Sequence, residues 1–353
     1  MSGKLGKILL ILIISIVAVL LIGFLVLFVT EYCPDDVEKL KSEGESIYKL
    51  EKGTTLNIVT YNIGYLSLDS SQDFFMDGGQ GIMPETNANV QNNLYGVKRY
   101  IKEKNADIYL LQEVDYKAKR SYKVNQYEEL KAGLGYVATY STYHKCLFIP
   151  YPLTNPVGYV HSGMMILNKY AGETERIAFD SAYKFPMSMV MFKRCLMVQR
   201  INIEDTDNEL VIINLHLEAY DNGNSREKQL KKLKDIMTEE YEKGNYVIAG
   251  GDFNHTFPVV DKSKYPVLDD RHFSAKEIPE DYLPEGFKYA VDDETPTSRL
   301  LDKSYKVEDK NTQLYVIDGY ILSPNVKLNS VKTVSNDFKY SDHHPVELNI
   351  TIE

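Results

Sequence analysis

The chain begins with one long apolar segment. Residues 8–29 contain only Ser15 and Gly23 as weakly polar breaks. A helix needs about 20 consecutive apolar residues to cross the hydrocarbon core of a bilayer, and this segment is long enough. The pattern therefore predicts a cytoplasmic tip and transmembrane anchor over residues 1–30. Residues 31–53 are charged and lack hydrophobic periodicity, so we expect a stalk there.

From residue 54 to 353 the pattern alternates between short apolar runs and a few amphipathic segments. Apolar residues at helical spacing predict helices, and runs rich in β-branched residues predict strands. The predicted helices cover residues 90–104, 126–132 and 225–243. The predicted strands cover residues 56–61, 107–112, 163–167, 177–179, 196–203, 210–215, 246–249, 314–322 and 346–352. Short strands with helices between them indicate a mixed α/β fold built in layers.

Three segments between these elements are expected to be irregular. Residues 64–86 are rich in Gly, Ser and Asp, and residues 255–312 form a polar, proline-containing insertion. Residues 141–160 combine Pro and Gly with aromatic and apolar side chains, which predicts an unusually apolar loop. That loop either covers the core as a flap or contacts lipid.

Charge and cysteine content narrow the picture further. The formal net charge of −10 disfavours non-specific binding to polyanions, because phosphate contacts are made mainly by Lys and Arg. It does not exclude an enzyme that reaches a phosphate through a bound cation. The three cysteines cannot all pair, so we expect free thiols and a fold stabilised by its core.

The charges that flank the apolar segment predict its orientation. Lys4 and Lys7 precede it, whereas Glu31, Asp35 and Asp36 follow it. Positive charge stays on the cytoplasmic side, so we expect a single-pass protein of the cell membrane with a cytoplasmic N-terminus and an extracellular domain. A cleaved signal peptide or a lipoprotein is the alternative. It is disfavoured by the length of the segment and by the absence of small residues before Cys33.

Polar residues that can support catalysis follow the predicted strands. Active-site groups are commonly held on loops positioned by such a scaffold. The candidate residues are Asn62, Glu113, His216, Asp252, Asn254, Asp318, Asp342 and His343. Each has an ordinary structural explanation when taken singly, such as a turn residue or a surface ion pair. Asp318 is harder to explain in that way, because an unpaired carboxylate in an apolar run is costly to bury.

Taken together and in this order, the motifs resemble the endonuclease/exonuclease/phosphatase superfamily, which includes deoxyribonucleases and neutral sphingomyelinases. The motifs are Asn62, Gln112-Glu113, His216, Gly251-Asp252-Phe253-Asn254, Ile317-Asp318 and Ser341-Asp342-His343. The resemblance spans residues 54–353. It implies a four-layered α/β sandwich in which two mixed β-sheets pack face to face, here with one N-terminal transmembrane helix.

The resemblance also implies roles for these residues. Glu113 is expected to be the main ligand of Mg²⁺ or Mn²⁺, with Asn62 nearby and Asp342 aiding a second metal position. Such hard cations take oxygen ligands and keep several waters. His343 is expected to act as general acid or base. Asp318 is expected to orient His343.

The remaining site residues are expected to act on water and phosphate. Asp252 holds or deprotonates the attacking water, Asn254 donates to a phosphate oxygen, and His216 hydrogen-bonds a non-bridging oxygen or assists the leaving group. His344 lies at a position that the family does not fix and is left out. Arg194 and Arg226 are candidate phosphate contacts, although surface arginines are common.

These features predict a membrane-anchored, metal-dependent phosphoesterase that uses in-line attack by water. The substrate is a lipid head group, such as that of a phospholipid or sphingomyelin, a nucleic acid or a small phosphoester. Anchoring, acidity and the apolar loop favour a lipid, whereas an extracellular nuclease rests on the family alone. A catalytically dead, membrane-tethered binding module is the alternative from a different class. Nothing in the sequence indicates a protein partner.

Overall fold

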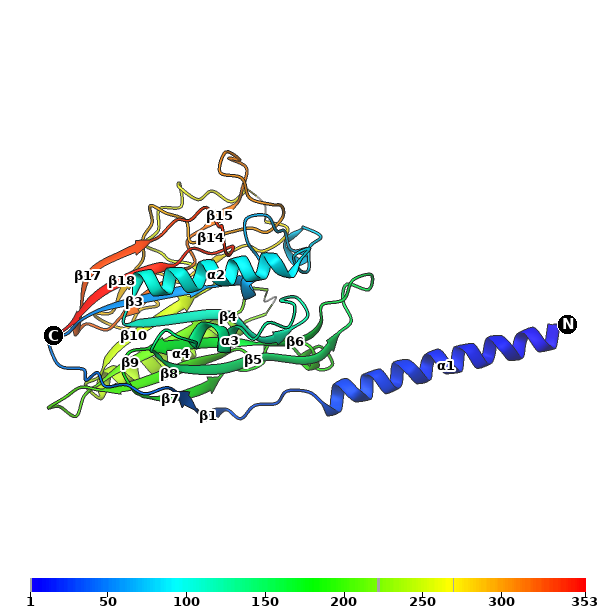
Figure 1. Cartoon of the computed structure of the whole chain (residues 1–353), viewed down its shortest axis with the longest axis horizontal. Helices are drawn as coiled ribbons and strands as arrows, with labels where there is room; N and C mark the ends of the chain where they lie inside the picture. The colour runs from blue at the N-terminus through cyan, green and yellow to red at the C-terminus, as the bar shows by residue number, and fades with distance from the viewer. Residues whose placement is uncertain (1, 221–222, 269) are drawn as a thin grey trace.

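The computed structural model describes residues 2–220, 223–268 and 270–353, so the first residue of the predicted cytoplasmic tip lies outside it. Its helices are few and lie mostly in the first two thirds of the chain (Figure 1). The α-helices are α1 (Ser2–Val29), α2 (Asn87–Lys104), α3 (Gln126–Lys131) and α4 (Ser225–Glu242). The 3-10 helices are η1 (Gly64–Leu66), η2 (Phe75–Asp77) and η3 (Met187–Met189).

Two seven-stranded mixed sheets form the centre of the fold. The first has the order β1 (Val37–Leu40), β7 (Glu173–Ala178), β8 (Cys195–Asn202), β9 (Glu209–His216), β10 (Tyr246–Asp252), β16 (Asp318–Leu322) and β13 (Lys288–Ala290). The second has the order β17 (Val326–Thr333), β18 (Val346–Ile352), β3 (Thr55–Asn62), β4 (Ile108–Ala118), β6 (Gly158–Asn168), β5 (Val137–Ile149) and β2 (Ser42–Glu43).

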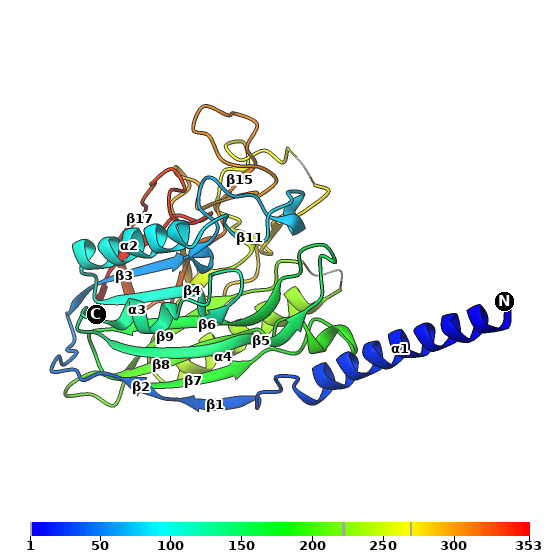
Figure 2. The ribbon, with the colours of Figure 1, turned by 45° about the vertical axis from the view of Figure 1, so that its right-hand side comes forward.

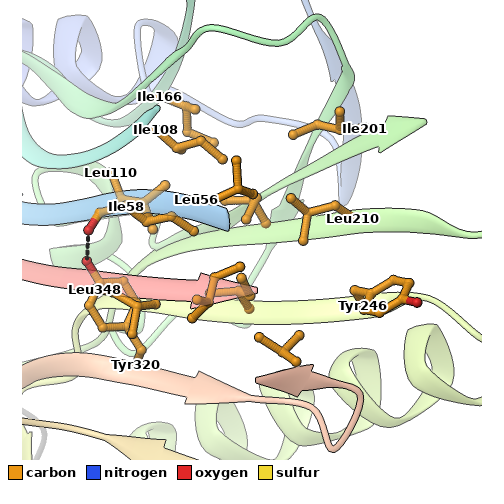
Figure 3. Packing of buried hydrophobic residues seen from close by; sticks show 14 of the residues in the cluster. Leu56, Ile58, Ile108, Leu110, Ile166, Ile201, Leu210, Tyr246, Tyr320 and Leu348 are labelled. Atoms are coloured by element: carbon orange, nitrogen blue, oxygen red, sulfur yellow. Dashed lines mark hydrogen bonds between the residues drawn. The ribbon is translucent and has the colours of Figure 1, made fainter. Parts of the chain in front are cut away.

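The two sheets pack face to face because alternate residues of their strands are apolar on the inner side. Leu56 and Ile58 of β3 lie in the same cluster as Leu210 of β9 and Tyr320 of β16 (Figure 3). The buried Tyr320 hydroxyl donates to the carbonyl of Val346, 2.8 Å away, and so links the sheets directly. The inter-sheet cluster is therefore the main core.

The outer faces of both sheets are also buried, which explains why their strands read as nearly continuous apolar runs. On one side, α2 and α3 pack on residues such as Tyr109 and Leu111 of β4. On the other side, α4 packs on residues such as Val211 and Val247. The result is a four-layered α/β sandwich, as the resemblance implied.

The helices form where the apolar spacing predicts them. Leu94, Val97 and Ile101 form the buried face of α2, which ends at Asn105 in a left-handed conformation. In α4, the chain leaves the helix at Gly244, which has a φ of 90°. Asn224 occupies the position before the first helical residue, Ser225, and its side chain makes no capping hydrogen bond.

The segment predicted as a stalk is not a free spacer. Within residues 31–53, β1 pairs with β7 at the edge of the first sheet, and β2 pairs with β5 at the edge of the second. These edge strands are half exposed and charged, and they attach through backbone hydrogen bonds rather than through an apolar face. The segment therefore fastens one sheet edge to the other.

The apolar segment 141–160 also differs from the prediction. Most of it belongs to β5 and β6, which form a long antiparallel hairpin, and only its tip is irregular. The insertion 255–312 is closer to expectation: apart from residue 269, which the structure does not describe, its strands are the short β11 (His255–Thr256), β12 (Lys276–Glu277), β13 and β14 (Ser298–Arg299). Of these, β14 pairs with β15 (Leu314–Tyr315).

The N-terminal helix α1 projects from one end of the sandwich (Figures 1 and 2). Its Lys4–Val29 portion is long and apolar enough to cross a membrane, and its most apolar stretch has no buried residue. Its last turns contact the domain, where Phe24 and Phe28 both lie edge-on against Phe185. The three cysteines are free thiols, as expected, and Cys33 alone of them is exposed.

Candidate active site

Strand register brings the predicted residues to one end of both sheets. In the first sheet, Asp252 at the end of β10 pairs with both His216 and Asp318. In the second, Asn62 ends β3 beside Gln112 of β4. The Asn62 amide donates to Asp252 Oδ2 across 3.0 Å, so the two sheet ends meet at this contact.

His343 and Asp318 form a buried hydrogen-bonded pair. His343 Nδ1 lies 2.8 Å from Asp318 Oδ2, and Asp318 is completely buried. Burial lowers the pKa of His343, but the carboxylates of Asp318, Asp252 and Asp342 outweigh it and raise the pKa above its usual value. The contact fixes the ring so that Nε2 points toward Asp252 Oδ2, 3.8 Å away.

Asp252 lies at the centre of the site. Its Oδ1 accepts the backbone N–H of Asn254 at 2.8 Å, while its Oδ2 accepts from Asn62 and lies 3.3 Å from His216 Nε2. Burial, followed by the charge of Asp318, raises the pKa of Asp252. A carboxylate whose pKa is raised toward neutrality is suited to accept a proton from water.

His216 is neutral in this environment. Burial and the neighbouring Arg194 lower its pKa well below the usual value. Its Nδ1 has no hydrogen-bond partner among the described residues. The Tyr143 ring lies edge-on to the imidazole at 5.8 Å between ring centroids and limits its movement. A neutral imidazole held in this way can share a hydrogen bond with a ligand without adding charge.

Glu113 and Asp342 provide two carboxylates in the same pocket. Burial and the charge of Asp342 raise the pKa of Glu113, because two neighbouring anions oppose each other. Glu113 adopts a φ of 55° at a bulge in β4, between the paired residues Leu111 and Val114. Such local strain persists only where the surrounding fold imposes it, often at functional sites.

These oxygen donors fit a hard divalent cation. Glu113 and Asp342 would hold such a cation, which would offset their mutual repulsion, and carboxylate chemistry suits Mg²⁺ or Mn²⁺. Asn62 Oδ1 accepts the Gly64 N–H, and its Nδ2 donates to Asp252, so both ends of its amide are held by hydrogen bonds. Asn62 lines the same pocket as Glu113 and Asp342.

A second, tighter cluster is made by Asp252, Asp318 and His343. One ligand atom of each lies within 4.8 Å of the others. The His343–Asp318 hydrogen bond already accounts for this closeness. Only Nδ1 of the imidazole is used in that bond, which leaves Nε2 for proton transfer or for a ligand.

Asn254 is held in a left-handed turn after β10. Its φ is 51°, a conformation that Asn tolerates better than most residues. The side-chain Nδ2 donates to the carbonyl of Leu217 at 2.9 Å, which fixes the amide at the pocket wall. One of its amide hydrogens is therefore used structurally, which leaves the other for a ligand.

All eight predicted residues but Asp318 line a single pocket with a cavity volume of about 100 Å³. Asp318 lies behind His343. Of the two candidate arginines, Arg194 lines the pocket, whereas Arg226 is not among its lining residues. Arg194 stacks on Phe192 at 4.3 Å, and its Nε and Nη1 have no hydrogen-bond partner among the described residues.

The sequence did not reveal several other pocket residues. Ser298 Oγ lies 3.2 Å from His343 Nε2, and Arg299 donates to the carbonyls of Asp69 and Gln72. Both come from the polar insertion, where no periodicity distinguishes them. Asp77 and Tyr220 also line the pocket and are hydrogen-bonded to each other. The only available signal was the placement of charged residues in loops, which is too common to single them out.

Comparison with known proteins agrees with this geometry. The sequence profile described as the endonuclease/exonuclease/phosphatase family matches residues 59–296, which include Asn62, Glu113, His216, Asp252 and Asn254. No curated protein matches the chain. Asp318, Asp342 and His343 lie beyond the matched range, and the fold places them beside the others.

Solved structures show the same fold at low sequence identity. An endonuclease/exonuclease/phosphatase from Beutenbergia cavernae aligns with a TM-score of 0.55 at 14% identity, over 84% of this chain and 72% of that one. The human Nocturnin catalytic domain with bound sulfate aligns at 0.53 and 14% identity, over 89% and 97%. The TDP2 of D. rerio, complexed with a single-strand DNA product, aligns at 0.51 and 16% identity, over 84% and 99%.

The profile covers two thirds of the chain, and the two packed sheets carry the acidic and histidine residues at one end. This chain therefore belongs to the endonuclease/exonuclease/phosphatase family.

Proposed function

We propose that the pocket hydrolyses a phosphoester by direct attack of water. Members of this family are usually hydrolytic phosphoesterases and typically depend on a divalent metal. The observation that carries the proposal is the His343–Asp318 pair directed at Asp252, in the same pocket as Glu113 and Asp342. This arrangement contains both a proton-transfer unit and an anionic cation site, which a pure binding module does not need.

The residues of this chain divide the work between proton transfer and phosphate binding. Asp252 holds the attacking water and takes its proton, while Asn62 and the Asn254 N–H keep its carboxylate in place. His343, held by Asp318, transfers a proton at Nε2. Asn254, His216 and Arg194 offer donors to phosphate oxygens. Glu113 and Asp342 would hold Mg²⁺ or Mn²⁺, which when bound would polarise the phosphoryl oxygen as a Lewis acid.

An activity assay with matched variants tests the proposal. The full-length chain in detergent should hydrolyse bis(p-nitrophenyl) phosphate with Mg²⁺ or Mn²⁺. Asp252→Asn should abolish this activity, whereas Asp261→Asn, at a carboxylate remote from the pocket lining, should not. A folded native chain without activity toward any phosphodiester or phosphomonoester, with either ion, would favour the binding module instead.

We also propose that α1 anchors the chain in the cell membrane, with a cytoplasmic N-terminus and the domain outside. The length and apolar character of α1 and the positions of Lys4 and Lys7 near its start support this orientation. Cys33 is a built-in reporter, because it is exposed while Cys146 and Cys195 are buried. A membrane-impermeant maleimide should label the native chain in intact cells, but not Cys33→Ser. If labelling requires cell lysis, the orientation of the chain is the reverse of the one proposed.

A further inference from the structure

Two adjacent segments of the surface are apolar and free of charge. Residues 146–160, at the tip of the β5–β6 hairpin, contain no Asp, Glu, Lys or Arg, and neither do residues 185–192. Several of their side chains are nonetheless exposed, including Leu153 at 87% and Phe185 at 60%. Exposed apolar patches of this kind mark interaction sites.

Residues 185–193 pack against the part of β5 that leads into the hairpin tip. The backbone N–H of Lys193 donates to the Tyr143 carbonyl of β5, and His144 Nε2 contacts the Val190 carbonyl at 2.9 Å. The Phe192 ring lies 4.3 Å from the His144 ring. The hairpin tip continues directly from this part of β5, and we call the two uncharged segments together the apolar rim.

Strand direction places the apolar rim at the catalytic end of the sandwich. In the second sheet, β5 runs in the same direction as β3, because both β5 and β4 are antiparallel to β6, and β4 is parallel to β3. The hairpin tip thus extends beyond the end of the sheet at which β3 finishes with Asn62. In the first sheet, β8 starts beside the end of β9, so residues 185–192 lie near His216.

The apolar rim is also continuous with the pocket wall. Phe74 and Met76 line the pocket, and Phe75 between them contacts Tyr151 of the hairpin tip at 5.7 Å. From the other side, Phe192 belongs to both the rim and the pocket lining. A ligand that reaches the pocket therefore passes beside this surface.

The end of α1 fixes the same surface at the level of the membrane. Phe24 and Phe28 of the apolar helix contact Phe185, with ring centroids 5.9 Å and 6.2 Å away. Lys193 forms an ion pair with Glu31 at 2.7 Å, just after the helix ends. Both views show the hairpin tip on the side from which α1 leaves (Figures 1 and 2). Phe185 is thus at the depth of residues that the anchor places in hydrocarbon.

From these contacts we infer that the apolar rim lies in the bilayer that holds α1 and presents the pocket to the phosphoester head groups of lipids in that same membrane. The assignment of lipid head groups as the substrate class rests on the proposed hydrolytic function. The proposed contact between the apolar rim and the bilayer does not depend on that hydrolytic function.

The chemistry of the rim favours a bilayer over a protein partner. Lys145, Lys184 and Lys193 border the uncharged segments, and such side chains extend toward the head groups while their stems stay apolar. Tyr151 and Tyr159 are residues typical of the membrane interface. Because α1 is joined to the rim by direct contacts, a bilayer around α1 meets the rim without any further association.

Fluorescence quenching tests the bilayer contact independently of activity. The chain has no Trp, so Leu153→Trp and Phe185→Trp each introduce a single reporter into the rim. Ile47→Trp is the matched control, an apolar residue 90% exposed in the segment after β2, toward the opposite end of the sandwich. The full-length variants are reconstituted into phosphatidylcholine vesicles with and without brominated acyl chains.

The two rim reporters should be quenched by brominated lipid, and the Ile47→Trp reporter should not. Rim reporters quenched no more than the control would overturn the inference. Rim fluorescence that changes with protein density in the vesicle, but not with bromination, would identify a second copy as the occupant and would also overturn it.

A paired activity assay tests the substrate class. Phe148→Ser and Leu153→Ser lie outside the pocket and should leave hydrolysis of soluble bis(p-nitrophenyl) phosphate unchanged. They should lower release of head groups from phosphatidylcholine or sphingomyelin vesicles by about tenfold or more, since small misplacements of bound groups have effects of that order. If the native chain hydrolyses only the soluble substrate, the lipid assignment fails. If it hydrolyses neither, the proposed function fails, while the quenching result still decides the bilayer contact.

Discussion

The carboxylate behind the catalytic histidine offers the sharpest test of the proposed mechanism. Asp318→Asn keeps the size of a completely buried side chain and removes only its charge. The backbone N–H of Asp318 donates to Thr297 Oγ1 and does not depend on the side chain. The substitution should therefore perturb the hydrogen bond to His343 Nδ1 with little change in packing.

The size of the effect follows from this one contact. A hydrogen bond to a charged group contributes about 1.5–3 kcal/mol. With about 1.4 kcal/mol for each factor of ten in rate, loss of this contact should lower kcat by about 10- to 150-fold. His343→Ala removes the proton-transfer group itself and should lower kcat by about 10²–10⁴-fold. Because Asp318 acts through His343, the double variant should be little slower than His343→Ala.

Stability should respond differently from activity. Asp318 raises the pKa of Asp252 by repulsion and the pKa of His343 by attraction, so neutralising Asp318 removes an unfavourable and a favourable interaction from the folded state, and the two losses oppose each other. The melting temperature of Asp318→Asn should therefore not fall with kcat. A merely structural role for Asp318 would lower both together.

His344→Ala is the matched control. His344 bonds to the Pro296 carbonyl and to the Phe338 N–H, and its ring stacks on Phe338 at 3.9 Å. Its loss should lower the melting temperature but leave kcat of the folded fraction nearly unchanged. The four variants are compared with bis(p-nitrophenyl) phosphate at saturating Mg²⁺, alongside melting curves. Full activity in Asp318→Asn, or additive losses in the double variant, would refute the pairing.

Other expectations concern the metal, acid stability and the core. Chelation should abolish activity, and Mg²⁺ at about 100 times its Kd should stabilise the folded chain by about 2.7 kcal/mol in a melting assay; Glu113→Gln should lose both responses. Burial lowers the pKa of His144 to about 3 and of His161 and His255 to about 4. These histidines stay neutral in the folded chain but protonate below about pH 6.5 in the unfolded chain. Their contribution to the free energy of unfolding is therefore full above that pH and falls toward pH 4. Each histidine should lower the free energy of unfolding by about 2 kcal/mol at pH 5, which urea titrations at several pH values will show. His161→Gln should make this fall shallower. Tyr320→Phe should lower the free energy of unfolding by about 1–3 kcal/mol in urea melts, because two buried carbonyls lose the same donor.

The sequence by itself determined which segments became the central strands and helices. Strands such as β9 and β10 are buried on both faces, so their apolar runs are recognisable without knowledge of their neighbours. The polar residues that end these runs, including His216 and Asp252, were visible for the same reason. The apolar segment that forms most of α1 was also evident, since its length and composition need no tertiary context.

Only the tertiary structure decided how the edges and loops are arranged. The strands β1 and β2 attach through backbone hydrogen bonds to distant partners, and such bonds leave no side-chain period in the sequence. The same holds for Ser298 and Arg299, which reach the pocket because β14 pairs with β15. Long-range pairing also placed the uncharged segments 146–160 and 185–192 side by side at the catalytic end. The lack of charge in each segment can be read from the local sequence. The shared surface of the two segments depends on strand direction, which no local sequence pattern encodes.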